Sequence, residues 1–345
     1  MGVRRTGPAA LIGPRRAGPA ARAGRRAVLS VAIAGVALAA CSAPAEPGAG
    51  RDTGATGSVV SPATPGTPAS SSPPAAAVAP VATLLAAGDI ASCGSTGDEA
   101  TAAVLDRAPG TIATLGDNVY QSGSIDEFER CYAPTWGRHR DRTRPAPGNH
   151  DYQTLGARGY FAYFGAAAGP LGKGYYSYDL GAWHAVVVNS NCAAVGGCHA
   201  GSAQERWLRA DLARSGRRCT LAYWHHPPFT SGAPHSNATW LRPIFQTLYD
   251  AGVEVALAGH NHQYERFAPQ TPAGRADPAR GVRMFVVGTG GASHYRFGAV
   301  QPNSEVRDST TYGVLRLTLH PDRYDWRFLP AGSGRFTDAG SYRCH

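Results

Sequence analysis

Short apolar runs along this chain lead repeatedly to a side chain that can bind a metal ion. TLLAAG leads to Asp89, TIATLG to Asp117, CTLAYW to His225 and VEVALAG to His260, while a Pro-Gly turn leads to Asn149. Apolar runs of this length between turn signals predict short buried strands. Because ligands collect outside the carboxyl ends of parallel strands, the pattern predicts one common site.

Helices are predicted where the apolar spacing changes to a helical period. Three such segments are residues 98–107, 202–214 and 239–249. Ser202 and Glu205 have the spacing of a capping box, and Gly252 is expected to follow the end of the third helix.

The remaining apolar segments predict strands and one loop. Residues 175–179 and 183–189 read as a hairpin, and 283–287, 312–319 and 324–329 read as strands without intervening helices. Residues 132–151 are punctuated by Pro and Gly and are expected to be mostly loop. Parallel units followed by hairpins predict an α/β chain of the mixed α+β kind, with two packed mixed sheets covered by helices.

The formal charge of +9 lies mainly in the amino-terminal segment. Residues 1–40 contain seven arginines and no acid, so the rest of the chain carries +2 and no nucleic-acid partner is expected. Basic residues followed by the apolar run 27–40 are typical of a signal peptide, which implies export. Residues 41–80 are rich in Pro, Ala, Ser and Thr and predict a disordered tether, with a catalytic domain at 81–345.

The end of the leader resembles two known export signals. LAAC, ending at Cys41, resembles a bacterial lipobox, and Arg25-Arg26 resembles a twin-arginine signal. The protein is therefore expected to be lipid-anchored through Cys41 to the outer face of the cytoplasmic membrane, or secreted.

Six cysteines remain if Cys41 carries lipid, and an even number in an exported protein predicts disulfides. Cys192 and Cys198 are the favoured local pair. Cys93 with Cys131 and Cys219 with Cys344 would complete a set, although the sequence alone does not choose among the 15 connectivities.

The ordered motifs GDI, GDNVY, GNHD, a strand ending in His225, and GHNHQYER resemble those of calcineurin-like metallophosphoesterases, in particular the purple acid phosphatase branch. The resemblance implies a four-layer αββα sandwich and a site for two metal ions. Asp89, Asp117, Tyr120 and His262 would hold the first metal, and Asp117, Asn149, His225 and His260 would hold the second.

Ala91 supports the purple branch. Many relatives have His at this position, two residues after the first Asp, whereas Ala cannot bind a metal and Tyr120 would take its place. Three anionic oxygens on one ion favour Fe(III) there, and the second site suits Zn, Mn or Fe(II).

The resemblance also implies catalytic and substrate roles. A hydroxide bridging the metals at Asp117 would attack phosphorus, and His150 would protonate the leaving alcohol or, alternatively, orient a ligand. His226 either faces the substrate or packs structurally. Tyr152, His235 and Arg138 are candidate pocket residues, and Glu265 with Arg266 is expected to form a supporting ion pair.

The predicted function is hydrolysis of phosphoric monoesters. A phosphodiesterase or nucleotide pyrophosphatase using the same metals is the alternative. A non-catalytic surface-binding module is less favoured because all seven ligand positions are filled, and a serine hydrolase is disfavoured because no GxSxG motif occurs. The sequence leaves the oligomeric state open.

Overall fold

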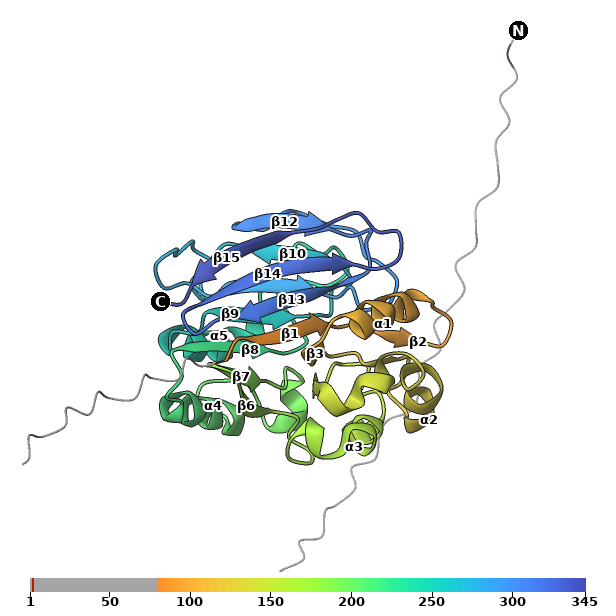
Figure 1. Cartoon of the computed structure of the whole chain (residues 1–345), viewed down its shortest axis with the longest axis horizontal. Coiled ribbons are helices and arrows are strands. Elements are labelled where there is room, and N and C mark those ends of the chain that lie inside the picture. Colours follow the sequence, from red (N-terminus) through yellow and green to blue (C-terminus); the bar gives the residue numbers. More distant parts are fainter. Residues whose placement is uncertain (1, 3–79) are drawn as a thin grey trace, which may run out of the picture. The chain divides into compact units, whose positions relative to one another are not determined.

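The computed structural model of the protein describes residue 2 and residues 80–345 (Figure 1). The predicted leader, Cys41 and the tether lie outside these residues and stay predictions. Within the described part, no helix is both long enough and apolar enough to cross a membrane.

Two β-sheets lie at the centre of the described part, and each contains both parallel and antiparallel neighbours. In hydrogen-bonded order, the six-stranded sheet consists of β15 (Ala339–Arg343), β14 (Arg323–Pro330), β13 (Gly313–Leu319), β1 (Ala82–Ala87), β3 (Thr111–Leu115) and β5 (Thr143–Ala146). The seven-stranded sheet consists of β12 (Ser304–Asp308), β10 (Tyr264–Phe267), β11 (Arg283–Val287), β9 (Val255–Ala258), β8 (Cys219–Tyr223), β7 (Trp183–Val187) and β6 (Tyr176–Leu180). A further short pair is β2 (Ala91–Ser92) with β4 (Val119–Tyr120).

Helices cover the sheets, as Figure 1 shows for α1, α4 and α5. The α-helices are α1 (Gly97–Arg107), α2 (Ile125–Glu127), α3 (Arg158–Phe164), α4 (Ala203–Arg214) and α5 (Arg242–Asp250). Shorter 3-10 or π turns are η1 (Phe128–Tyr132), η2 (Trp136–Arg142), η3 (Leu155–Ala157), η4 (Gly165–Ala168), η5 (Cys192–Val195) and η6 (Thr239–Leu241).

The two-residue period of β8 explains the layers. Leu221 and Tyr223 belong to the core that the two sheets share, whereas Ala222 and Trp224 belong to a second core with residues of α4 and α5. A strand buried on both faces reads as a continuous apolar run, which is what the sequence shows at CTLAYW. The predicted packing of two mixed sheets covered by helices is confirmed.

The predicted loop at 132–151 was wrong in part, because it contains β5. Pro145 argued against a strand, but β5 is the edge strand of its sheet and pairs in parallel only with β3. Proline is tolerated at such an edge because it needs no ladder hydrogen bond on its outer side.

The predicted capping box of α4 forms only by half. The Ser202 hydroxyl accepts a hydrogen bond from the Glu205 backbone N–H, but the Glu205 carboxylate accepts from Gly201 N–H and Thr247 instead of Ser202. A complete capping box occurs at Ser124 and Glu127, which the sequence analysis did not predict.

All three predicted disulfides are present. They join Cys93 to Cys131, Cys192 to Cys198, and Cys219 to Cys344, with Cα–Cα distances of 5.0, 5.2 and 5.8 Å. Disulfides persist in oxidising surroundings, so this set fits an exported protein.

Candidate metal centre

Five of the predicted site residues follow the carboxyl ends of strands. Asp89 follows β1, Asp117 follows β3, Asn149 follows β5, His225 follows β8 and His260 follows β9. The pairs β1–β3, β3–β5 and β8–β9 are parallel, so within each sheet these ends lie on the same edge. The two edges meet, and the side chains converge from both sheets.

Tyr120 is at the centre of the first group of donors. Its hydroxyl oxygen lies 3.0 Å from Asp89 Oδ1, 3.2 Å from Asp117 Oδ2 and 3.1 Å from His262 Nε2. The four side chains assigned to the first metal are therefore in mutual contact.

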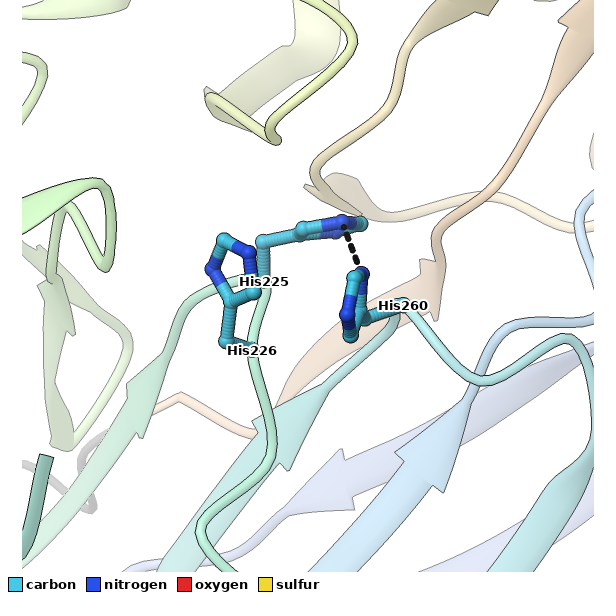
Figure 2. Close-up of side chains that lie close together, drawn as sticks. All are labelled: His225, His226 and His260. Atoms are coloured by element: carbon cyan, nitrogen blue, oxygen red, sulfur yellow. Dashed lines mark hydrogen bonds between the residues drawn. The ribbon is translucent and has the colours of Figure 1, made fainter. Parts of the chain in front are cut away.

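His225 is at the centre of the second group. Its Nε2 lies 3.0 Å from Asn149 Oδ1, 3.2 Å from Asp117 Oδ2 and 3.1 Å from His260 Nδ1. Figure 2 shows this contact between the His225 and His260 rings, which lie edge-on to each other, with His226 beside them. Asp117 Oδ2 belongs to both groups, as a bridging ligand would.

Three residues of this site have strained backbone conformations. Asp89, Asp117 and His260 have φ values of 60°, 47° and 71°, in the left-handed region that residues with a Cβ rarely adopt. Such conformations cost about 1–3 kcal/mol each and persist where the surroundings enforce them, often at functional sites.

Two motif glycines allow the site loops to approach closely. A Cβ at Gly148 would collide with the backbone nitrogen and carboxylate of Asp117, and one at Gly259 would lie 2.7 Å from Asp89 Oδ2. The glycines of GNHD and GHNH are thus required by the packing of the carboxylates.

Backbone carbonyls set the tautomers of two histidines. His225 Nδ1–H donates to Leu115 O at 2.8 Å, and His262 Nδ1–H donates to Ser293 O at 2.6 Å. With Nδ1 protonated in the neutral ring, the Nε2 lone pair of each faces the site. This arrangement is typical of histidines that bind metals.

The charges of the site also fit cations. Asp89 and Asp117 are 0% and 2% exposed, and among the described residues their ion pairs are with histidines only. Burial opposes ionisation of Asp117, but the charge and hydrogen bond of His225 outweigh it and hold the Asp117 pKa below its usual value. Two buried carboxylates in one network need positive charge for compensation, so these residues fit a pair of metal ions.

The pKa values of Tyr120 and His260 point the same way. Burial and the neighbouring Asp89 and Asp117 carboxylates raise the pKa of Tyr120 well above its usual value, so a phenolate there needs a nearby cation. Burial and the charge of His225 lower the pKa of His260, which favours the neutral ring that a metal ligand requires. Against the effect of burial, the Asp117 carboxylate raises the pKa of His225 to about 9 and Asp89 raises that of His262, so these two rings hold a proton where a metal ion would bind.

A cavity of about 540 Å³ opens beside the first group. Tyr120, His150 and His262 line it together with Tyr295 and Tyr312. His150 is partly exposed; its backbone N–H donates to Asp117 Oδ1, and its ring donates from Nδ1 to Gln121 O at 2.7 Å. Nε2 is the ring nitrogen left for a ligand in this cavity.

Tyr295 and Tyr312 were not predicted as site residues. The Tyr295 ring stacks on His262 at 3.8 Å, nearly parallel. The signal that could have found this loop is Gly288, which follows the strand β11 as the other motif glycines follow theirs.

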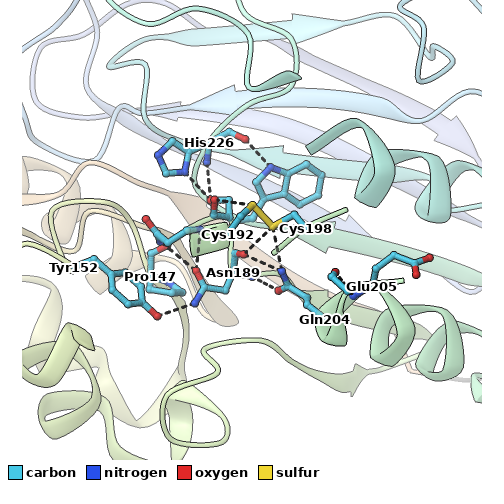
Figure 3. Close-up of a disulfide and its surroundings, with 12 residues drawn as sticks. Pro147, Tyr152, Asn189, Cys192, Cys198, Gln204, Glu205 and His226 are labelled. Atoms are coloured by element: carbon cyan, nitrogen blue, oxygen red, sulfur yellow. Dashed lines mark hydrogen bonds between the residues drawn. A yellow bond between two sulfur atoms is a disulfide. The ribbon is translucent and has the colours of Figure 1, made fainter. Parts of the chain in front are cut away.

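His226 and Tyr152 are held by the loop that follows β7 (Figure 3). Ser190 Oγ lies 2.8 Å from His226 Nδ1 and also accepts the His226 backbone N–H. Asn189 Nδ2 donates to the Tyr152 hydroxyl at 2.8 Å. Burial, followed by the charge of His225, lowers the pKa of His226 to about 3. His226 therefore lies beside the donor groups as a neutral ring, while the Tyr152 hydroxyl is engaged by Asn189.

The other candidate pocket residues differ in position. The His235 ring lies 4.0 Å from the His260 ring, at the edge of the site. Arg138 instead makes a bidentate ion pair with Asp106 on α1.

The predicted ion pair between Glu265 and Arg266 is wrong. Successive residues of β10 point to opposite faces, so the two side chains diverge. Glu265 accepts hydrogen bonds from Ser231, whereas Arg266 pairs with Asp338 and Glu305.

Asp151 ties two motif loops together, a role that the sequence analysis did not assign. Its Oδ2 accepts hydrogen bonds from Gly148 N–H at 2.8 Å, from Asn118 Nδ2 at 2.9 Å and from Asn118 N–H at 3.3 Å. The carboxylate is fully buried and fixes the GDN loop against the GNHD loop.

Comparison with known proteins agrees with this geometry. A sequence model described as calcineurin-like phosphoesterase matches residues 80–264. Purple acid phosphatase 21 of Arabidopsis thaliana is 31% identical over 201 residues, which are 55% of this chain and 44% of that protein. The chain spans less than half the length of the curated relatives it matches.

Two solved structures share the fold. The purple acid phosphatase PPD1 from yellow lupin seeds has a TM-score of 0.58 at 16% identity, covering 76% of this chain and 54% of that one. GAP50, the anchor in the inner membrane complex of Plasmodium, has a TM-score of 0.55 at 13% identity, covering 75% and 88%. Because the family match spans more than half of the chain and includes every strand end that carries a candidate ligand, the protein belongs to the calcineurin-like phosphoesterase family.

Proposed function

We propose that the protein is a phosphoric monoester hydrolase that works with two metal ions. The observation that carries this proposal is the convergence of seven oxygen and imidazole donors, two of them buried carboxylates that no Lys or Arg of the described residues neutralises. A bound metal pair would supply positive charge that stabilises the phosphoryl oxygens and lowers the pKa of a water molecule.

The assigned residues would have three roles, namely metal binding, proton donation and binding of phosphoryl oxygens. Asp89, Tyr120 and His262 would hold one ion, Asn149, His225 and His260 the other, and Asp117 both. His150 would give a proton from Nε2 to the leaving alcohol, because its Nδ1 already donates to Gln121 and its ring lines the cavity. His226 and His235, whose rings lie beside His260, would bind phosphoryl oxygens.

The cavity supports an uncharged alcohol as the leaving group. Apart from Tyr120, His150 and His262, its walls are serine, threonine, glycine, alanine, glutamine and tyrosine residues, and no Lys or Arg lines it. A nucleotide polyphosphate would bring additional negative charge without a cation to meet it. This favours a monoesterase over the nucleotide pyrophosphatase alternative.

Metal analysis combined with paired substrates tests the proposal. We expect close to two metal ions per chain and faster hydrolysis of p-nitrophenyl phosphate than of bis(p-nitrophenyl) phosphate. Faster hydrolysis of the diester would instead indicate a phosphodiesterase. Full metal occupancy without hydrolysis of either ester would instead support a binding module; GAP50, which has a similar fold, is described as an anchor.

We further propose that the metal ion bound by Tyr120 is Fe(III). A phenolate on Fe(III) absorbs visible light, so iron-loaded protein should be coloured and Tyr120→Phe should lose the band at equal iron content. Identical spectra would remove Tyr120 from the metal shell and leave Zn or Mn as the fitting ions.

Lipid anchoring through Cys41 is a separate proposal that rests on the LAAC motif. Cys41→Ser should move the protein from the membrane fraction to the soluble fraction or block its processing. Unchanged fractionation would indicate a plain secretory signal or an uncleaved anchor.

A further inference from the structure

A second cavity, of about 550 Å³, lies away from the metal centre and is surrounded by arginines. Arg107 at the end of α1, Arg316 on β13, Arg327 on β14 and Arg335 in the following loop line it. We call this cavity the arginine groove. It lies on the six-stranded sheet and beside the C-terminal end of α1, and its lining contains no Asp or Glu.

The four guanidinium groups have no partner of their own. Among the described residues, none of the four takes part in an ion pair or in a side-chain hydrogen bond, whereas Arg138 of η2 forms an ion pair with Asp106 of α1. Unpaired arginines are common on surfaces, but here four share one concavity. The chain after residue 40 has a net charge of only +2, so this is a local excess.

The register of the sheet places two of these arginines where their like charges destabilise the sheet. Arg316 and Arg327 are directly opposite each other in the antiparallel pair of β13 and β14. Like charges in opposed positions on one face destabilise a sheet. An anion between them would convert that repulsion into attraction.

The floor of the groove is apolar. Val104 is 6% exposed and Leu329 is half-buried. Ala108, Pro109 and Pro330 are the other apolar residues of the lining, and Thr83 and Thr337 complete it. Guanidinium groups match phosphate and sulfate oxygens with paired N–H donors. A volume of this size is within the range of small-molecule sites.

The geometry points to the arginine groove as a binding site for a soluble organic anion that carries two or more phosphate or sulfate groups on an apolar body. The amino-terminal segment does not suit the groove, because residues 1–79 contain eight arginines and only two acids, Glu46 and Asp52. The inference is independent of the proposed hydrolase activity.

Titration with 1,5-naphthalenedisulfonate tests the site. This probe is a dianion with an apolar body and has no ester bond to hydrolyse. We expect saturable binding at one site, weakened about tenfold or more in Arg316→Gln/Arg327→Gln. The matched control is Arg158→Gln/Arg242→Gln, which removes the same charge from exposed positions on α3 and α5 and should bind normally.

Thermal unfolding separates a binding role from a structural one. Removing the opposed charges should leave the Tm of Arg316→Gln/Arg327→Gln unchanged or higher. Arg335→Gln, in a loop outside the sheet, should weaken probe binding by itself.

Three results would overturn the inference. Equal binding by the groove variant and its control would show a general charge effect. A lower Tm in the groove variant, with normal binding by Arg335→Gln, would make the arginines structural. Arginine-dependent binding to phosphatidylglycerol vesicles without binding of the soluble probe would identify a membrane-facing surface instead.

Discussion

The two parts of the sandwich that flank residue 264 use strands in different ways. Before it, the parallel pairs among β1, β3, β5, β8 and β9 bring their carboxyl ends to one place, and all seven candidate ligands lie there. After it, β13, β14 and β15 are antiparallel, so successive strand ends point in opposite directions. The second part completes both sheets and carries three of the four arginines of the arginine groove, but it brings no candidate ligand.

Parallel strands bring candidate metal ligands together at one edge of a sheet, whereas antiparallel strands distribute side chains over a face of the sheet. A parallel strand can place one donor at a shared edge. An antiparallel meander instead presents alternate residues, such as Arg316 and Arg327, on a broad surface. Variants of the two parts should therefore affect different properties.

The largest effect is expected from the bridging carboxylate. Asp117→Ala removes an oxygen shared by both donor groups and should lower kcat/KM by about 10³-fold or more, because several kcal/mol of metal-derived stabilisation are lost. Asn149→Ala should have a comparable effect through the second group. Steady-state kinetics with metal analysis checks both variants.

Circular dichroism and thermal unfolding provide the control for these two variants. Both should remain folded, because the strands do not depend on the side chains at their ends. Near-normal turnover in either variant, with two metals still bound, would contradict the two-metal assignment.

The next effect is expected at Asp151, which holds the loops of the first part in place. Asp151→Ala should lower metal affinity and kcat/KM by about 10–100-fold, since partners that orient ligands have effects of this size. Asp151→Asn keeps one acceptor for Gly148 N–H and should lose less. Excess metal should partly restore Asp151→Ala but not Asp117→Ala; equal behaviour of the two would make Asp151 a ligand rather than a positioning residue.

The sequence predicted the first part better than the second for a physical reason. Strand ends that hold ligands need an apolar run, a glycine and a donor in fixed order, as at Gly116-Asp117 and Gly259-His260. Such a pattern is visible in one sequence. By contrast β12 and β15 are short and polar, with few buried residues, and they exist because neighbouring strands pair with them.

Contacts between segments that are distant in the sequence explain why β5 and the roles of Tyr295 and Asp151 were not predicted. Pro145 argued against β5, which pairing with β3 makes possible. Tyr295 and Asp151 act through residues far away in the sequence or through backbone groups, so their residue types alone carried no signal for these roles.

Two of the disulfides should differ in how much they stabilise the fold. Cys219–Cys344 joins β8, which leads to His225, to the end of the chain across 125 residues. Cys219→Ser/Cys344→Ser should lower the free energy of unfolding by up to about 5 kcal/mol, against about 2 kcal/mol for Cys192→Ser/Cys198→Ser with its six-residue separation.

Activity should follow the opposite order. The short disulfide adjoins Ser190, which contacts His226, so its loss should reduce turnover more than loss of the long one at a temperature where both variants are folded. Chemical unfolding and kinetics at that temperature measure the two effects. A larger loss of stability from the short bridge would contradict the loop-entropy explanation.

The smallest effect is expected at Asp98 in α1, outside both donor groups. Burial raises the pKa of Asp98 from 3.8 to about 7, although the Thr135 hydroxyl donates a hydrogen bond to Oδ2 at 2.9 Å. Between these two pH values the folded protein keeps a proton that the unfolded chain has lost. Stability therefore falls as pH rises through this window, and the loss is complete above about pH 7.

Asp98→Asn removes this penalty because the amide stays neutral and its oxygen still accepts from Thr135. The variant should be more stable than the intact protein at pH 8 and nearly equal to it at pH 4. Glu129→Gln, at an exposed position and with the same change of charge, is the matched control and should shift stability less. Chemical unfolding across pH 4–8 gives both curves; if Asp98→Asn and the intact protein lose stability in parallel, another group is responsible for the pH dependence.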